Sequence, residues 1–242
     1  ITLNNANAFT GAVALNTTGS SAHATVVDAS GLNLAASTVG GNLSATATTG
    51  NMTDSGVLTI AGTSSFTTSA TDADIILNNA NAFTGAVALN TTGSSGNATV
   101  VDASGLNLGA STVGGNLSAT ATTGNMEDSG VLTIAGTSSF TTSANNATIT
   151  LNNANAFTNA VALNTTGSTG HATVVDASGL NLGASTVGGN LIATATTGNM
   201  EDSGVLTIAG TSSFTTSATD ATITLNNANA FTGAVSLNTT GS

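Results

Sequence analysis

The segment GNLSATATTGN, residues 41–51, decides the fold. It returns unchanged at residues 115–125, and again at 189–199 with Ile192 in place of the first serine. Its polar Ser and Thr residues alternate with small apolar ones, and this two-residue period is typical of a strand with one buried face. Gly and Asn at both ends tolerate turn geometry. We therefore predict a short strand between two turns, written three times along the chain.

The whole chain repeats with this same spacing. The word LNNANAF begins at Leu3, Leu77, Leu151 and Leu225. The resulting copies are residues 1–74, 75–148 and 149–222, with a partial copy at 223–242. We interpret them as one continuous repeat array, because self-similarity at a fixed period is the signature of solenoid architectures. Since the chain opens at Ile1 and stops within the fourth copy, we expect a piece of a longer array.

Each copy divides again into four pieces of about 18–19 residues, a length typical of one coil of a β-solenoid. Every piece opens on an alternating run (ITL, ATVVD, NLSATA or VLTIA), and a second run follows inside most of them (AVAL, LNL or SSFTTS). We therefore predict an all-β, parallel β-helix with about four coils in each repeat. Stacking at about 4.8 Å would give a rise of roughly 19 Å per repeat.

The composition supports a thin, repetitive interior. The chain has no Pro, Cys, Trp or Tyr, only seven Phe, and 5% charged residues. Such a chain lacks the bulky side chains of a thick core. Helix is disfavoured because the period is two and the residues are mostly Thr, Ser, Asn, Gly and Val. Disorder is disfavoured because mean hydropathy is +0.29. A β-sandwich is the alternative, and the regular subdivision of each copy argues against it.

The charge excludes two classes of partner. The chain has 11 acidic residues, no Lys or Arg, and a net charge of −11. Nucleic-acid binding draws its affinity from Lys and Arg, so we expect no nucleic acid. We also expect no membrane insertion, because no run of 18 apolar residues exists and an anionic surface would repel the chain. The absence of Cys is compatible with an extracellular bacterial protein.

Two packing features follow from the predicted coils. Phe66 and Phe83 are 17 residues apart, about one coil, so we expect them to stack. The same holds for Phe140 with Phe157 and for Phe214 with Phe231. The second feature is the set of Asn-rich corners, which includes Asn4, Asn5 and Asn7. These corners are expected to take left-handed backbone conformations and to bond through their amides to the coils above and below.

The titratable residues recur in register but form no catalytic set. His23 and His171 occupy one register, in which the second copy has Asn97. They would lie roughly 38 Å apart, so we interpret them as exposed turn residues. Two aspartate series recur, Asp28, Asp102, Asp176 after ATVV and Asp54, Asp128, Asp202 before SG. We interpret both as turn residues that bond their own backbone. The alternative is a weak Ca²⁺ site at Glu127–Asp128 and Glu201–Asp202.

We therefore predict no catalytic, cofactor-binding or metal-binding residue. The calcium-binding motif GGxGxD of other solenoids is absent, because the GG of each repeat is followed by NL. Some β-helix proteins are polysaccharide lyases or hydrolases, which makes an enzyme the third hypothesis. Such chemistry needs clustered acids, often with a Lys or Arg that stabilises developing negative charge, and this chain has neither cation.

Two further patterns are common in a chain rich in Asn and Thr. Sequons for N-glycosylation occur at Asn16, Asn42, Asn51, Asn90, Asn97, Asn116, Asn146, Asn164 and Asn238. Thr-x-Thr pairs occur at Thr46/Thr48, Thr120/Thr122 and Thr194/Thr196. Ice binding needs such a pair on essentially every coil, and here it recurs about every fourth coil, so we disfavour it.

The repeat words resemble a known family. GGNLSATATTGNMTDSGVLTIAGTSSFTTS (residues 40–69) and ITLNNANAFTGAVALN (residues 1–16) are similar to repeats of very large, filamentous-haemagglutinin-like bacterial adhesins. The resemblance covers the whole chain, and its motif is compositional. It implies a right-handed parallel β-helix, secretion to the bacterial cell surface, and a role in adhesion or biofilm.

We predict that the chain is a structural shaft of an extracellular or cell-surface fibre. The alternative is a glycan- or partner-binding module with a functional lateral face, which the absence of Trp and Tyr disfavours. Neighbouring repeats are the expected partners, together with other copies of the protein end to end or side by side. The physical reason is that unpaired strand edges template association.

Overall fold

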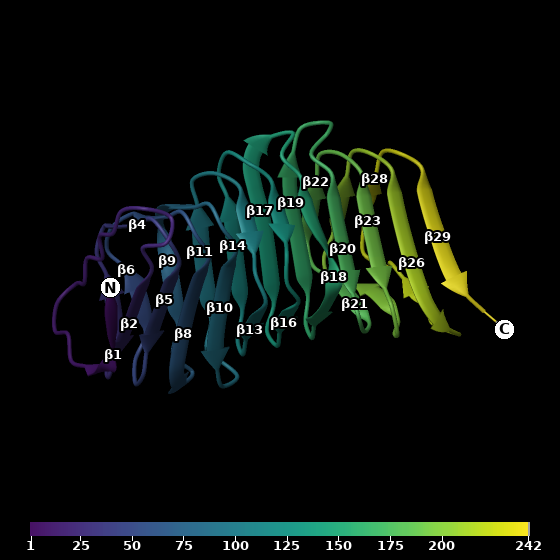
Figure 1. Cartoon of the computed structure of the whole chain (residues 1–242). Coiled ribbons are helices and arrows are strands. Elements are labelled where there is room, and N and C mark those ends of the chain that lie inside the picture. The colour runs from purple at the N-terminus through teal and green to yellow at the C-terminus, as the bar shows by residue number, and fades with distance from the viewer. Residues whose placement is uncertain (242) are drawn as a thin grey trace.

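The chain is a parallel β-solenoid, described for residues 1–241 in a computed structural model. Strands and turns make up the described residues, with no helix among them. The N- and C-termini lie at opposite ends of an elongated stack, along which the colour runs in chain order (Figure 1). The predicted fold class is therefore confirmed.

Two parallel sheets form the walls of the solenoid. Sheet A has 14 strands: β1 (Thr2–Asn7), β2 (Ala24–Asp28), β5 (Leu43–Ala47), β8 (Ser64–Thr71), β10 (Val87–Thr92), β12 (Leu106–Leu108), β13 (Ser111–Val113), β15 (Met126–Asp128), β16 (Leu132–Ile134), β18 (Ile149–Phe157), β20 (Ala172–Asp176), β23 (Leu191–Ala195), β26 (Ser212–Thr219) and β29 (Val235–Thr240). Sheet B has 15 strands: β3 (Leu32–Leu34), β4 (Ser37–Val39), β6 (Met52–Asp54), β7 (Leu58–Ile60), β9 (Ile75–Phe83), β11 (Ala98–Asp102), β14 (Leu117–Ala121), β17 (Ser138–Asn145), β19 (Val161–Thr166), β21 (Leu180–Leu182), β22 (Ser185–Val187), β24 (Met200–Asp202), β25 (Leu206–Ile208), β27 (Ile223–Thr224) and β28 (Ala230–Phe231).

Each coil takes about 21 residues, and the chain makes about 11 turns. The register shows the variation, since Ala24 pairs with Leu43, Leu43 with Ser64, and Ser64 with Val87. The prediction of about 18–19 residues per coil, taken from the usual length of a solenoid coil, is therefore wrong. Coils are longer because the segment LNNANAF, whose residues are typical of turns, lies inside the nine-residue strands β9 and β18. The pairing register of these strands shifts within this segment.

Each repeat consists of seven half-coils, which corrects the prediction of four coils. Half a coil is either one strand, such as ATVVD, or a pair of short strands, such as LNL and STV. The seven alternating runs of each copy are these seven half-coils, and the error lay in treating them as four complete coils. Seven steps along sheet A lead from β2 to β20, which lie two repeats apart. One repeat is therefore three and a half coils, with a rise of about 17 Å.

An odd number of half-coils moves each word to the opposite sheet in the next repeat. The strand ATVVD is β2 in sheet A, then β11 in sheet B, then β20 in sheet A again. The other words of the repeat alternate in the same way. Sheets A and B therefore carry the same sequence, displaced by one repeat.

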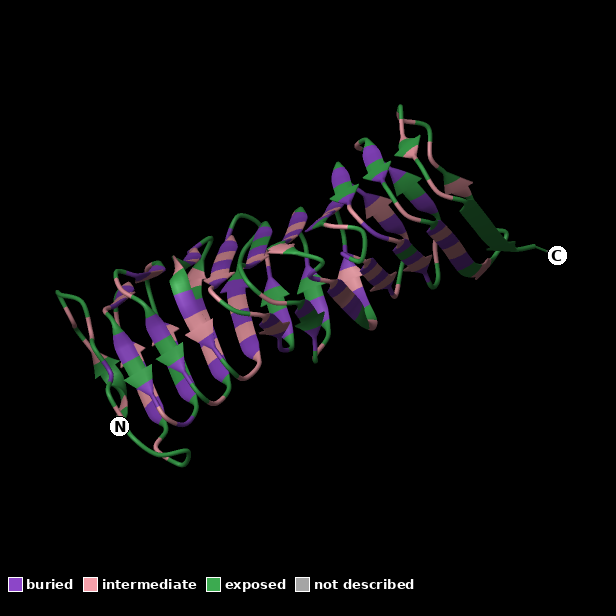
Figure 2. Cartoon of the chain, turned by 90° about the horizontal axis from the view of Figure 1, so that it is seen from above, coloured by how far each residue is buried: buried purple, intermediate pink, exposed green. Residues whose placement is uncertain are grey.

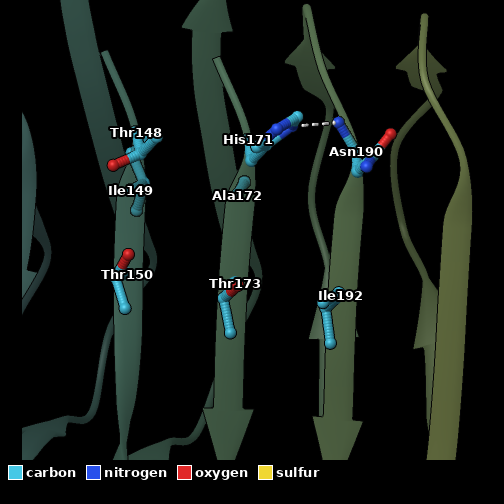
Figure 3. A pocket seen from close by; sticks show the side chains of 8 residues that line it. All are labelled: Thr148, Ile149, Thr150, His171, Ala172, Thr173, Asn190 and Ile192. Carbon is cyan, nitrogen blue, oxygen red and sulfur yellow. Dashed lines mark hydrogen bonds between the residues drawn. The ribbon is translucent and has the colours of Figure 1, made fainter. Parts of the chain in front are cut away.

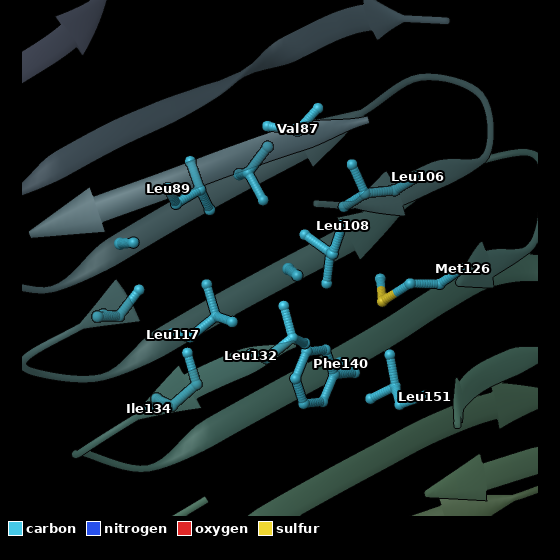
Figure 4. Packing of buried hydrophobic residues seen from close by; sticks show 14 of the residues in the cluster. Val87, Leu89, Leu106, Leu108, Leu117, Met126, Leu132, Ile134, Phe140 and Leu151 are labelled. Carbon is cyan, nitrogen blue, oxygen red and sulfur yellow. The ribbon is translucent and has the colours of Figure 1, made fainter. Parts of the chain in front are cut away.

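The interior is a single stack of small and medium apolar side chains. Strand residues alternate between buried and exposed or half-buried positions, which gives the bands seen in Figure 2. Leu, Val, Ile, Met and Ala of successive coils form one continuous buried cluster. Figure 4 shows a section of it, to which sheet A contributes Leu108 and Leu132 and sheet B contributes Phe140. Burial of about 25 cal/mol per Å² makes this the main stabilising term.

The three predicted aromatic pairs form, but across the interior. Phe66 and Phe83 have ring centroids 5.8 Å apart at an interplanar angle of 67°, an edge-to-face contact. Phe140–Phe157 and Phe214–Phe231 make the same kind of contact. Because Phe66 lies in β8 of sheet A and Phe83 in β9 of sheet B, each pair joins facing sheets. The rings do not stack one coil apart on the same sheet.

The prediction about Asn-rich corners is half right. Asn4, Asn5 and Asn7 lie in strand β1, and the positive-φ residues other than Gly are Asp72, Asn146 and Asp220 in residues 1–241. Amide bonding between coils does occur, because Asn7 donates its Nδ2 to the carbonyl of Val27 at 3.0 Å.

Candidate functional site

The first aspartate series forms buried turns at the ends of ATVVD strands. The Oδ1 of Asp102 accepts hydrogen bonds from the amide and the hydroxyl of Ser104, both at 2.9 Å. Its Oδ2 accepts the amide of Phe83, one coil away, at 3.1 Å. The prediction that these residues bond their own turn is confirmed for Asp28, Asp102 and Asp176. The sequence analysis missed the second bond, which fastens the turn to the neighbouring coil.

Burial raises the pKa of two of these carboxyl groups, Asp102 and Asp176, above the ordinary value of 3.8. The hydrogen bonds from Ser104 and Phe83 act in the opposite direction at Asp102 but do not cancel the cost of desolvation. These carboxylates are buried acceptors in a chain without Lys or Arg, so backbone amides and hydroxyls take the place of counter-ions.

The second aspartate series joins coils, and its interpretation as a set of self-bonding turns is wrong. Asp128 accepts the amide of Asn152 at 2.9 Å and the side chain of Asn155 at 2.7 Å, both on the next coil. Asn155 is fully buried, and its Oδ1 accepts the amide of Leu132 at 2.8 Å. The same clip joins Asp54 to Asn81. The recurring spacing of 27 residues between this Asp and Asn is the sequence signal that could have found it.

The hydrogen bonds of this clip outweigh burial at Asp202. Burial acts to raise the pKa of the Asp202 carboxyl, but bonds from Asn229, Asn226 and Asn227 lower it below the ordinary value of 3.8. The pKa shifts resolved in the two aspartate series therefore have opposite directions.

The predicted alternative of a calcium site at Glu127–Asp128 does not fit the strand geometry. Glu127 is exposed and Asp128 is buried in β15, because successive side chains of a strand point to opposite faces. Glu201 and Asp202 of β24 differ in the same way. Within residues 1–241, no three His, Cys, Asp or Glu side chains gather closely enough to hold a metal.

The two histidines are structural acceptors at the corner before an ATVVD strand. His171 accepts the amide of Asn190 through Nδ1 at 2.8 Å (Figure 3), and His23 accepts that of Asn42 at 2.9 Å. In the second copy Asn97 accepts the amide of Asn116 through Oδ1 at 2.8 Å. Histidine and asparagine are thus interchangeable as acceptors here. A shallow hollow of about 280 Å³ lies beside His171, lined by Ile192, which is 48% exposed.

The sequon residues Asn42, Asn51 and Asn116 belong to corner ladders, together with equivalent asparagines of the other copies that lie outside sequons. Asn42, Asn116 and Asn190 accept an amide of the next coil through Oδ1, at 2.8–3.0 Å. Asn51, Asn125 and Asn199 do the same at 2.9 Å. Their role in the fold accounts for the recurrence of these asparagines.

The Thr-x-Thr pairs do not form a continuous array on a sheet. Thr46 lies in β5, paired with Val27 and Thr67, whereas Thr48 follows the strand at the corner. The pairs also alternate between the sheets from one repeat to the next, because β5 is in sheet A and β14 is in sheet B.

A polar hollow recurs at the same register in two copies. In one it has a volume of about 290 Å³ and is lined by Thr84, Gly105, Leu106, Asn107, Asn125 and Glu127. In the next it has a volume of about 350 Å³ and is lined by Thr158, Asn159, Gly179, Leu180, Asn181, Asn199 and Glu201. This recurring polar hollow combines amide, hydroxyl and carboxylate side chains.

These features define a parallel β-solenoid repeat protein whose polar residues mostly fasten one coil to the next. Residues 21–90, 95–164 and 169–238 match a family described as repeats of unknown function (DUF5649), and the chain belongs to this family. The three segments begin at equivalent positions of the successive copies. No curated protein and no solved structure matches the chain. The described residues hold no helix of the length and apolarity needed to cross a membrane.

Proposed function

We propose that this chain is part of the structural shaft of a secreted or cell-surface bacterial fibre, which gives a stiff rod for adhesion, biofilm or extracellular filament formation. The resemblance of its repeat words to filamentous-haemagglutinin-like adhesins supports the extracellular setting and the adhesive role. The contacts of its polar residues support a structural rather than a chemical role, because the two Asp series and the corner Asn residues hold coils together.

The observation that carries this proposal is the unbroken pairing of strands from β1 to β29 along sheet A. No insertion interrupts the stack in the described residues, and each coil covers the apolar interior of the one before it. In such quasi-one-dimensional proteins, stability is approximately a sum of repeat and interface terms, so a rod can lengthen without a thicker core. Repeat number then sets the reach of the fibre.

The experiment is a length series. Chains of three, six and nine copies would be imaged by cryo-electron microscopy as isolated particles. We expect rods whose length increases by about 17 Å for each added copy at constant width. Compact particles, or a length that does not follow copy number, would refute the shaft.

A second readout addresses the surface role. Trypsin has no Lys or Arg to cleave in this chain. A bacterial surface fibre containing these repeats should therefore lose flanking segments to trypsin while the repeat region stays at full length. Detection of the repeats only inside cells would contradict the extracellular assignment.

A further inference from the structure

We propose that the recurring polar hollow binds a single hexose or hexosamine unit of a polysaccharide, which would make the solenoid a two-sided, multivalent saccharide binder. This inference goes beyond the shaft and does not require it. It begins from the recurrence of one concave site, built from equivalent residues, beside Glu127 in β15 and beside Glu201 in β24.

One asparagine of this hollow, Asn107, has a side-chain oxygen that accepts no hydrogen bond within the described residues. The Oδ1 of Asn107 is buried and has no hydrogen-bond partner among the described residues, and the same is true of Asn181 and Asn33. A buried acceptor without a donor is costly, so its recurrence in three copies calls for an explanation. The terminal torsion of Asn is soft, and a small rotation would turn this amide toward the hollow that it lines.

The other groups complete a mixed set of donors and acceptors. Asn125 accepts the amide of Thr148 through Oδ1 at 2.9 Å. This contact does not use its Nδ2 group, which can donate to a ligand. Glu127 is exposed on the outer side of its strand and contributes a carboxylate. Thr84 contributes a hydroxyl. The hollow thus offers amide donors, amide and carboxylate acceptors, and a hydroxyl.

This set selects the chemical class of ligand. A phosphate or a uronic acid is repelled by the glutamate and by the net charge of −11. A divalent cation wants six to eight oxygens and has no use for amide donors. Vicinal hydroxyl groups both donate and accept, so they match amides and a carboxylate together. The amino group of a hexosamine adds a charge-assisted bond to the glutamate. At about 300 Å³ the hollow is at the small end of ligand sites, suited to one ring.

The half-coil geometry places successive sites on opposite sheets. Glu127 lies on sheet A and Glu201 on sheet B, about 17 Å apart along the axis. A short oligosaccharide therefore occupies the two sites independently, while a long array bridges separate polysaccharide chains on its two sides. Because no aromatic ring lines the hollow, each site is weak, with a Kd on the order of 1–10 mM, and repetition supplies avidity.

The first copy provides a natural variant of the site. Thr53 occupies the position of Glu127 and Glu201, so Glu→Thr is a substitution that this fold already accommodates. The matched control is Asp72→Asn with Asp220→Asn, which removes two charges at exposed turns away from the hollows. The second copy carries Asn146 at that register with the same positive φ, so the control also preserves the fold.

The experiment is calorimetric titration of the 242-residue chain with three probes: a β-1,4-linked glucosamine tetrasaccharide, cellotetraose and tetragalacturonate. We expect the glucosamine probe, and more weakly cellotetraose, to bind at two glutamate-containing sites. Glu127→Thr should leave one glutamate-containing site, and the double Glu→Thr variant should weaken binding about tenfold. The Asp→Asn control should bind like the parent chain.

Three results would overturn the proposal. The first is no binding of either neutral or amino probe up to about 50 mM, several times the upper end of the expected Kd. The second is an equal loss of binding in the Asp→Asn control, which would mean that binding depends on net charge and not on the glutamates of the hollow. The third is equal binding of tetragalacturonate. Circular dichroism of each variant verifies the β-solenoid, so a null result is not a failure of folding.

Discussion

At the scale of single residues, this protein shows how carboxylates are buried without cations. Asp102 and Asp128 each receive hydrogen bonds from amides of their own turn or of an adjacent coil. Charge-assisted bonds of this kind are stronger than neutral ones, and they satisfy groups that would otherwise be costly to bury. The acidic residues therefore act as fasteners, although their net charge works against compaction.

The clip between Asp128 and Asn155 can be tested by substitution. Asn155→Leu leaves the buried amide of Leu132 without a partner and removes one of the hydrogen bonds to the Asp128 carboxylate, so we expect a loss of about 2–4 kcal/mol in the free energy of unfolding. Urea denaturation measures this loss, and hydrogen exchange should show weakened protection of the Leu132 amide. The control is Asn159→Gly, which copies Gly85 of the second repeat, removes one exposed hydrogen bond to the carbonyl of Ala135, and should change stability by less than about 1 kcal/mol. Equal effects of the two substitutions would refute the clip.

The opposite pKa shifts of the aspartates predict how stability depends on pH. Asp102 and Asp176 have a raised pKa in the folded state, so as pH falls toward 3.8 the folded chain takes up protons before the unfolded chain does. Stability therefore rises over that interval. Asp202 has a lowered pKa, so its contribution is lost as pH drops below 3.8. Without Lys or Arg, no ion pair with those residues is broken by acid.

We expect the urea midpoint to rise as pH is lowered from neutral toward 3.8. The measurement is made in a His23→Asn, His171→Asn background, so that only carboxyl groups are compared. This background preserves the corner, because Asn97 makes the same contact in the second copy. Carboxyl titration by NMR should place the pKa of Asp102 and Asp176 above 3.8 and that of Asp202 below it. A midpoint that falls steadily over the same range would be the opposite of this expectation.

At the scale of elements, the unit of construction is the half-coil. The alternating runs visible in the sequence correspond to the strands, and their inward residues form the core as the period of two requires. What the pattern did not reveal is that LNNANAF continues a strand. Asn81 in this word is fully buried, and a polar residue among turn formers gives no local sign of that. Its burial depends on Asp54, which lies on another coil.

The aromatic pairs are contacts between facing elements. Phe140 is fully buried against Phe157, so Phe140→Ala should cost about 3–5 kcal/mol, the usual range for a large cavity in a core. Phe9 is only partly buried and has no such ring partner in the described residues, so Phe9→Ala should cost less than half as much. Thermal unfolding followed by circular dichroism compares the two. Similar losses would mean that the pair adds nothing to the packing.

At the scale of the whole molecule, the odd number of half-coils sets the symmetry of the rod. Copies one and three present the ATVVD strand on sheet A, and copy two presents it on sheet B. A ligand or partner that recognises one repeat therefore meets equivalent surfaces on both sides. Along one side, equivalent surfaces recur every seven coils, about 34 Å.

Spin labels can measure this alternation, because the chain has no native cysteine. Thr25, Thr99 and Thr173 occupy the same outward register of β2, β11 and β20. The double substitution Thr25→Cys, Thr173→Cys should give a narrow distance distribution centred at about 34 Å. Label pairs formed with Thr99→Cys should be longer than the axial separation of about 17 Å alone, because they cross the rod. Three labels on one side at multiples of about 19 Å would instead support whole-coil repeats.

The sequence by itself determined the all-β class, the spacing of the copies and the alternation of inward and outward residues. These features depend on a local two-residue period and on direct comparison of one copy with the next. The sequence also predicted that Phe66 and Phe83 meet. The tertiary structure alone decided the coil length, the half-coil offset, and the contacts of Asp54, Asp128 and the buried asparagines. These features depend on which residues pair with each other after one full coil of about 21 residues. The length of a coil is set by the packing of the whole coil and cannot be read from any short sequence segment.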